Sequence, residues 1–182
     1  MIGPSTTLRE LAFIVCSAMD AGGTKAILSG GGAATVYAPE ACQSHDLDFI
    51  FEYWSTVTQP SAQPLFDIGF VQQGQSYVHP RTPLTVEFPS GPLAIGDELI
   101  TQWDTLREGD LVLYILSSTD CVRDRLAWFM FNNDFSSLEQ ALAVARHNPV
   151  DLDFIEHWCK REGELGKYQT FADRLAQTRD DY

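Results

Sequence analysis

The sequence lacks two kinds of segment, and both absences narrow the possible protein classes. No apolar run approaches the roughly 18 residues that a membrane-spanning helix needs. The first twenty residues carry Arg9, Glu10 and Asp20 and have no basic start followed by an apolar core, so they do not resemble a secretory signal. We therefore expect a cytoplasmic protein that does not contact a membrane.

Cysteine is sparse, and no two cysteines form a C-x-x-C pair. This spacing argues against a zinc cluster and against a tight disulfide framework. Free cysteine is among the residues most often buried, so we expect plain buried or half-buried thiols in a reducing compartment. The four residues concerned are Cys16, Cys42, Cys121 and Cys159.

Positive charge is also scarce, because 12 Lys and Arg stand against 25 Asp and Glu and give a net charge of -13. Binding to duplex nucleic acid normally needs a basic face, so this balance argues against such a partner. Most of the carboxylates are expected simply to solvate the surface. An acidic chain can still bind a nucleotide through a divalent metal ion, which offsets part of the negative charge.

The 182 residues are 45% hydrophobic and 12% aromatic, as in a globular protein with a sizeable core. Strand-like segments occur up to residue 116, and the pattern becomes helical from residue 118. We predict an α+β fold with a mixed sheet and flanking helices over residues 1–117. A C-terminal helical subdomain over 118–182 is expected to pack on it, with helices at about 119–132, 136–148, 150–161 and 165–177.

A glycine-rich turn is the first motif with chemical meaning. The segment 26–28 is apolar on both faces, as in a covered strand, and runs directly into Ser29, Gly30, Gly31 and Gly32. A short helix is expected to follow these glycines. Such a turn offers backbone amides that a phosphate group can approach closely. A loose turn without a ligand is the alternative, because glycine clusters are first of all turn signals.

An acidic pair is the second motif. Asp46 and Asp48 are two residues apart on a predicted strand over 46–52, so both carboxylates project from one face. At that spacing they can hold one or two hard cations. The apolar Ile50 shares their face, which makes simple solvent exposure less natural, although most acidic residues are merely exposed.

The order of these motifs resembles the signature of the nucleotidyltransferase superfamily, and in particular its minimal and toxin-related prokaryotic members. An apolar strand precedes Gly31 and Gly32, thirteen residues follow, and then Asp46 and Asp48 flank an apolar residue. The family takes a third carboxylate from a later strand, and Glu87 is the matching position. Glutamate there departs from the commoner aspartate. The resemblance covers roughly residues 8–116 and implies the family's mixed sheet.

The resemblance implies transfer of a nucleoside monophosphate from a nucleoside triphosphate to an acceptor hydroxyl or phosphate. Two Mg²⁺ or Mn²⁺ ions would be held by Asp46, Asp48 and Glu87, while the protein mainly positions the reacting groups. The glycine turn, with Ser29, would cradle the phosphates. The acceptor stays open between a small molecule, a protein and transfer RNA, and the few basic residues make transfer RNA the least attractive.

Three further residues have two possible roles each. Arg123 and Arg125 either reach the triphosphate, because guanidinium suits phosphate, or form an intrahelical charge pattern with Asp120 and Asp124. His45, directly before the acidic pair, either touches a ligand or has no role beyond the start of the strand.

Aromatic residues recur at helical spacing in the C-terminal part, where they are expected to be core and not a platform for base stacking. They are Trp128, Phe129, Phe131, Trp158 and Phe171.

Two other functions remain open at this point. The chain is alternatively a catalytically silent nucleotide-binding protein, or a toxin–antitoxin-type interaction protein that uses the same fold. In the plainest alternative the carboxylates hold a structural ion or nothing, and the glycines only turn the chain.

Overall fold

The computed structural model describes residues 1–52 and 60–177. In these residues the chain forms a mixed α+β fold with a mixed sheet and seven helices. The helices are α1 (Leu8–Ala21), α2 (Gly30–Tyr37), α3 (Gln63–Asp67), α4 (Ser118–Asn132), α5 (Phe135–His147), α6 (Leu152–Arg161) and α7 (Leu165–Gln177). The α+β prediction is confirmed at this level.

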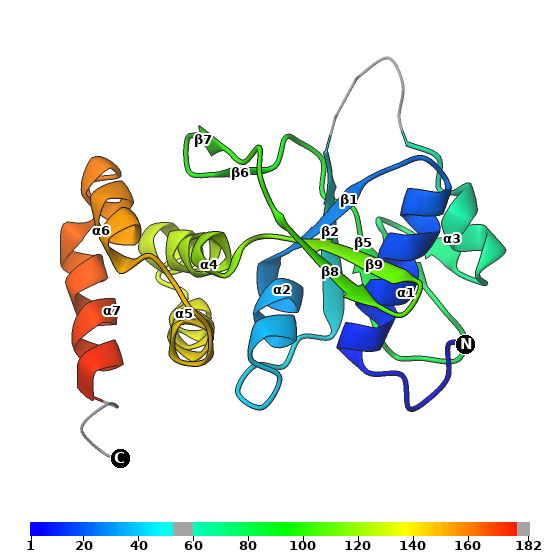
Figure 1. Cartoon of the computed structure of the whole chain (residues 1–182), viewed down its shortest axis with the longest axis horizontal. Helices are drawn as coiled ribbons and strands as arrows, with labels where there is room; N and C mark the ends of the chain where they lie inside the picture. The colour runs from blue at the N-terminus through cyan, green and yellow to red at the C-terminus, as the bar shows by residue number, and fades with distance from the viewer. Residues whose placement is uncertain (53–59, 178–182) are drawn as a thin grey trace.

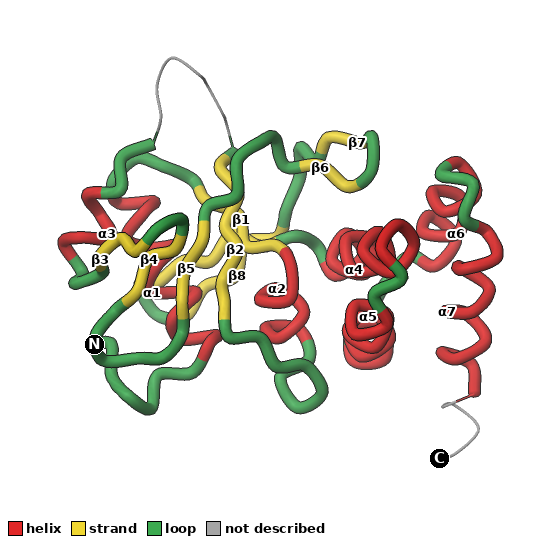
Figure 2. The backbone as a smooth tube through the Cα atoms, turned by 180° about the vertical axis from the view of Figure 1, so that it is seen from behind, coloured by secondary structure: helices red, strands yellow, loops and turns green. Residues whose placement is uncertain are grey.

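The main sheet has the strand order β3-β4-β5-β2-β1-β9-β8. Its strands are β1 (Ala26–Ser29), β2 (Asp46–Phe51), β3 (Val71–Gln73), β4 (Ser76–Val78), β5 (Thr85–Glu87), β8 (Asp104–Glu108) and β9 (Leu111–Ile115). The pairs β1–β9 and β2–β5 are parallel, and the other neighbours are antiparallel. A small hairpin of β6 (Ala94–Ile95) and β7 (Glu98–Leu99) lies beside α4 (Figure 2).

The side chains of the central strand β2 alternate between an apolar and a polar face of the sheet. Leu47, Phe49 and Phe51 are buried, whereas Asp46 and Asp48 alternate with them and keep partial exposure. This alternation is the one expected for a strand with one face toward the core. The prediction that both aspartates share a face is confirmed.

Helix α1 covers the apolar face. It begins at a capping box in which Thr7 accepts from the backbone of Glu10 and the Glu10 carboxylate accepts from the backbone of Thr7. The Cys16 thiol lies between two strands, where it donates to the carbonyl of Ala26 and accepts from the backbone of Tyr114. This contact ties α1 to both β1 and β9.

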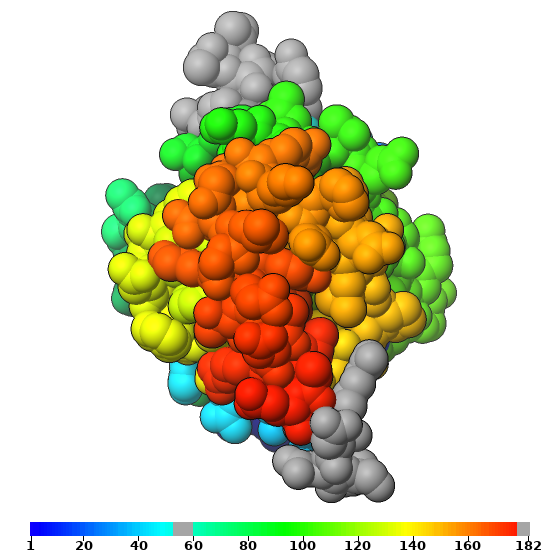
Figure 3. Space-filling model, turned by 90° about the vertical axis from the view of Figure 1, so that its left-hand side faces the viewer, coloured from blue at the N-terminus to red at the C-terminus, as the bar shows by residue number. Residues whose placement is uncertain are grey.

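Helix α2 lies between the sheet and the C-terminal helices, with α4 and α5 packed on it (Figure 1). The side chain of Asn148, after α5, donates to the carbonyl of Tyr37 at the end of α2. Helices α6 and α7 cover the far end of the molecule (Figure 3). Helix α4 begins at Ser118, where the helical part was expected to start, while the division into separate domains stays a prediction.

All four cysteines are free and buried, so the prediction of plain buried thiols is confirmed. Burial raises the pKa of the Cys16 thiol to about 11 and that of Cys159 to about 12. None of the helices within the described residues combines the length and apolar character that crossing a bilayer requires.

Candidate functional site

Three neighbouring strands bring Ser29, Asp48 and Glu87 into one row across the polar face. The β1–β2 pairing places Ser29 opposite Asp48, and the parallel β2–β5 pairing places Asp48 beside Glu87. Residues paired across strands project to the same side of a sheet. Asp46 lies on that side as well, two residues before Asp48. The three carboxylates predicted from the sequence, Asp46, Asp48 and Glu87, therefore lie on one face of the sheet.

Serine hydroxyls hold two of these carboxylates. Ser44 Oγ donates to Asp46 Oδ1 at 2.5 Å, and Ser76 Oγ donates to Glu87 Oε1 at 2.5 Å. Ser76 reaches Glu87 because β4 pairs with β5 in a register that sets the two residues opposite each other. Sequence reasoning missed both serines, and for Ser76 the reason is that no short-range spacing links it to Glu87.

The carboxylates also act on one another electrostatically. Burial, together with the negative charges of Asp46 and Glu87, raises the pKa of Asp48 to about 6. Arg125 acts in the opposite direction, while Asp124 adds to the rise. Among the described residues, Arg125 is the cation that acts on Asp48, and it is outnumbered by the carboxylates. Such an excess of negative charge favours a bound cation.

The glycines differ from the expected turn, since Gly30, Gly31 and Gly32 form the first turn of α2 itself. Gly30 has φ +66°, and a Cβ atom there would lie 2.7 Å from Asp48 Oδ2. At Gly32 a Cβ atom would lie 3.2 Å from the carbonyl oxygen of Asp46. These glycines therefore let the start of α2 approach the acidic strand. The free N–H groups of a first helical turn are the groups that bind anions.

Arg125 forms a wall of the site from α4. It is 8% exposed, and its Nη2 and Nε donate to Asp124 Oδ2 at 2.6 and 3.0 Å. Its Nη1 lies 3.4 Å from Gln140 Oε1 on α5. The amide nitrogen of Gln140 lies 3.5 Å from the Cβ position of Gly31, so α2, α4 and α5 meet here. Like the two serines, Gln140 lies at the site and was not predicted from the sequence.

Of the two roles left open for Arg123, the structure shows the intrahelical one, an ion pair with Asp120. Two positions apart on a helix correspond to about 200° around its axis, so the two guanidinium groups face different neighbours. Arg123 is 2% exposed and forms ion pairs with Asp120 at 2.8 Å and with Glu98 of β7. The rings of Phe154 and Trp158 lie 4.8 and 4.9 Å from its guanidinium carbon. It joins β7, α4 and α6, and it belongs to the packing of the helical part.

The remaining candidates divide between surface and core. His45 is exposed at the start of β2, where its carbonyl accepts from the backbone of Thr85. The prediction of core aromatics is confirmed for Phe129, Trp158 and Phe171, which are buried. It is wrong for Trp128 and Phe131, which are 51% and 52% exposed because their positions on α4 face away from α5 to α7.

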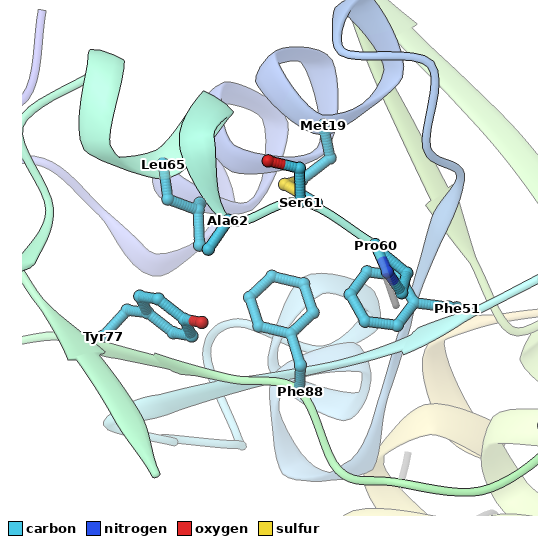
Figure 4. A pocket seen from close by; sticks show the side chains of 8 residues that line it. All are labelled: Met19, Phe51, Pro60, Ser61, Ala62, Leu65, Tyr77 and Phe88. Atoms are coloured by element: carbon cyan, nitrogen blue, oxygen red, sulfur yellow. The ribbon is translucent and has the colours of Figure 1, made fainter. Parts of the chain in front are cut away.

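A separate apolar cavity does not belong to this site. A cavity of about 150 Å³ lies on the opposite, apolar face of the sheet, between β2, α1 and α3 (Figure 4). Phe51, Phe88 and Tyr77 line it with their rings, and Met19 and Leu65 close it from the helices. It is separated from the carboxylates by the sheet itself.

As the side chains stand, residues 1–52 and 60–177 hold no group of three or more His, Cys, Asp or Glu arranged to bind a metal ion. Asp46 and Glu87 each point one oxygen at a serine hydroxyl instead. The site is thus a row of carboxylates beside a glycine-rich helix start and one buried arginine. In comparisons with known proteins, no family model, no curated protein and no solved structure matches the chain.

Proposed function

We propose that this chain is a metal-dependent nucleotidyltransferase of the nucleotidyltransferase fold, which transfers a nucleoside monophosphate from a nucleoside triphosphate to an acceptor. One observation carries the proposal. Asp46, Asp48 and Glu87 share one face of adjacent parallel strands, and the glycine-rich start of α2 lies against Asp48. A row of carboxylates beside free helix amides combines a cation site with a phosphate site.

The donor set fits Mg²⁺ or Mn²⁺. Carboxylate oxygens are the ligands that these hard ions prefer, and the pKa of Asp48 is raised by burial and by its like-charged neighbours. A divalent cation would relieve that repulsion. When bound, such ions neutralise the triphosphate and lower the pKa of an attacking hydroxyl. Asp46 and Glu87 would turn one oxygen each from their serines toward the ion.

The triphosphate would lie along the start of α2. The N–H groups of the first turn of α2, formed by Gly30, Gly31 and Gly32, would bind its oxygens, and Arg125 would add a buried guanidinium from α4. Asp124 holds that guanidinium in place while no phosphate is bound. Guanidinium binds phosphate oxygens in a bidentate manner, so Arg125 is the cation that we assign to the phosphates.

The reaction needs little covalent chemistry from the protein. The acceptor hydroxyl oxygen forms a bond to the α-phosphorus, the bond from that phosphorus to the bridging oxygen breaks, and pyrophosphate leaves with that oxygen. Glu87 takes the hydroxyl proton on the carboxylate oxygen that Ser76 does not engage. The main contribution of the chain is the placement of both reactants.

A thermal-shift experiment tests this proposal. Mn²⁺ together with a nucleoside triphosphate should raise the melting temperature, because a ligand that binds only the folded state stabilises it. The double variant Asp46→Asn with Asp48→Asn should lose that rise. The matched control is Asp97→Asn with Asp110→Asn, which removes the same charge from two exposed positions and should keep it. An equal rise in both double variants would refute the site assignment.

A catalytically silent nucleotide-binding protein is the second candidate. It is favoured by the engagement of Asp46 and Glu87 with serine hydroxyls, which leaves the carboxylates apart as they stand. Incubation with α-labelled triphosphates and candidate acceptors separates the two functions. Covalent label on an acceptor identifies the enzyme, whereas binding without any transfer identifies the silent protein.

A further inference from the structure

A groove of about 560 Å³ lies beside Ser44 and His45, just before the start of β2, and the three carboxylates do not line it. It opens between the N-terminal segment, α2 and the loops that precede β2 and β5, and Leu8, Thr35 and Leu84 contribute to its walls. Ser44 belongs to both places, because it lines the groove and donates to Asp46 at 2.5 Å. The groove therefore begins one hydrogen bond away from a proposed metal ligand.

The walls of this groove carry almost no charge. Of the described residues that line it, Arg9 is the one with a permanent charge, and Arg9 is already paired with Glu108 at 2.6 Å. The other wall residues are apolar or neutral, including Pro39 and Pro83. A phosphate-bearing or nucleic-acid ligand would find no free cation here, and it would face the repulsion of the neighbouring carboxylates.

The rim offers hydrogen-bonding groups that the protein does not use. The side chains of Gln43 and His45 are exposed at the groove, and within the described part of the chain neither makes a hydrogen bond. An amide and an imidazole both donate and accept, so they suit hydroxyl groups. Most pockets for small molecules share this combination of apolar walls and a few polar groups.

We propose that this groove binds the acceptor substrate, and that the acceptor is a small uncharged molecule with an apolar body and at least one hydroxyl group. The inference rests on the proposed function. It narrows the acceptor from three classes to one, and it sets Ser44 between the acceptor and Asp46. The hydroxyl oxygen gained by the α-phosphorus is the acceptor's own, pyrophosphate leaves, and the proton passes to Glu87.

Binding can be measured without any reaction. Proton NMR resolves the imidazole signals of the four histidines, and His45→Ala identifies the His45 signal by its loss. Octyl glucoside, below its micellar concentration, should shift the His45 signal and leave those of His79, His147 and His157 in place. Glucose tests the need for an apolar body, while glucose 6-phosphate and glucosamine test the two charged classes. A stronger shift of His45 with either charged sugar, or no shift with octyl glucoside, overturns the inference.

Groove variants test the same point by transfer. With α-labelled triphosphates and octyl glucoside, Gln43→Ala and His45→Ala should each raise the acceptor KM about tenfold, the factor expected for one lost hydrogen bond. Pro83→Trp should fill the groove and abolish transfer, whereas Ala176→Trp on α7 adds the same ring at an exposed distant site and should not.

The thermal shift with Mn²⁺ and triphosphate separates the two possible failures. If the shift is present in Pro83→Trp and transfer goes to transfer RNA or protein at an unchanged rate, the groove is not the acceptor site and the proposed function stands. If the shift is absent in the wild type, the proposed function itself fails. In that case a shift of the His45 signal with octyl glucoside would show that the groove binds such a molecule but that the protein does not catalyse the proposed transfer.

Discussion

Gly30 lies directly against the carboxylate of Asp48, so closely that a Cβ atom at Gly30 would stand 2.7 Å from Oδ2. The same residue has φ +66°, a conformation that side chains with a Cβ rarely adopt. Gly30 is therefore required for two independent reasons, the positive φ and the lack of space for a Cβ atom. Because glycine meets both requirements, the start of α2 can approach the acidic strand.

We predict that Gly30→Ala destabilises the fold by about 2–4 kcal/mol, since backbone strain of about 1–2 kcal/mol adds to the clash with Asp48. Gly74→Ala is the matched control, because Gly74 has φ +64° and nothing within 4 Å of its Cβ position. It should show the strain alone. Urea denaturation measures both, and equal losses in the two variants would mean that the contact with Asp48 contributes nothing.

We predict that Asp48→Asn stabilises the ligand-free protein at neutral pH. The folded pKa of Asp48, about 6, lies above the unfolded value of about 3.9. The folded state therefore binds more protons between these values, and stability falls as pH rises from about 4 to about 6. Removal of the charge should recover on the order of 1 kcal/mol above pH 6, allowing for partial solvent screening.

Urea denaturation of wild type and Asp48→Asn at a series of pH values checks this sign. The gap between the two proteins should close as pH falls toward 4. Asp97→Asn, at an exposed position, should follow the wild type throughout. If Asp48→Asn is instead less stable than the wild type at neutral pH, and this difference vanishes at acidic pH, Asp48 is stabilised as the carboxylate.

Substitution of Arg125 and of Arg123 should have different effects, one on ligand binding and the other on stability. Arg125→Met is expected to weaken binding of a triphosphate with Mn²⁺ by tenfold or more, because it removes the charge-assisted contact assigned to the phosphates. Arg123→Met should instead destabilise the fold by about 2–4 kcal/mol, because it leaves Glu98 and Asp120 without their buried partner. Isothermal titration and urea denaturation distinguish the two losses, and a reversed pattern would contradict our assignment.

Ser76→Ala should change the metal site without unfolding the protein. Its hydroxyl holds Glu87 from the neighbouring strand, and residues that orient ligands typically tune metal affinity by about 10–100-fold. We expect a change in the Mn²⁺ dissociation constant, while Ser90→Ala, at an exposed position, leaves it as in the wild type. Electron paramagnetic resonance of free Mn²⁺ reports the constant directly, and identical values for both variants would remove Ser76 from the site.

Local patterns were sufficient for much of the fold. The alternation around β2 predicted which residues face the core, since a strand has a period of two whatever it pairs with. Helical periodicity likewise located the four C-terminal helices within a few residues. Strand β8 carries no such signal, because its residues, Asp104–Glu108, are mostly exposed at the sheet edge and show no apolar alternation.

The sequence by itself determined that Asp46 and Asp48 share a face and that three glycines directly follow an apolar strand, because both properties depend on neighbours along the chain. Tertiary structure alone decided that Glu87 lies beside Asp48, that Ser76 holds it, and that Arg125 and Gln140 face this site while Arg123 does not. These relationships depend on strand register and on helix orientation. Both are set by packing between segments far apart in sequence, which no local spacing encodes.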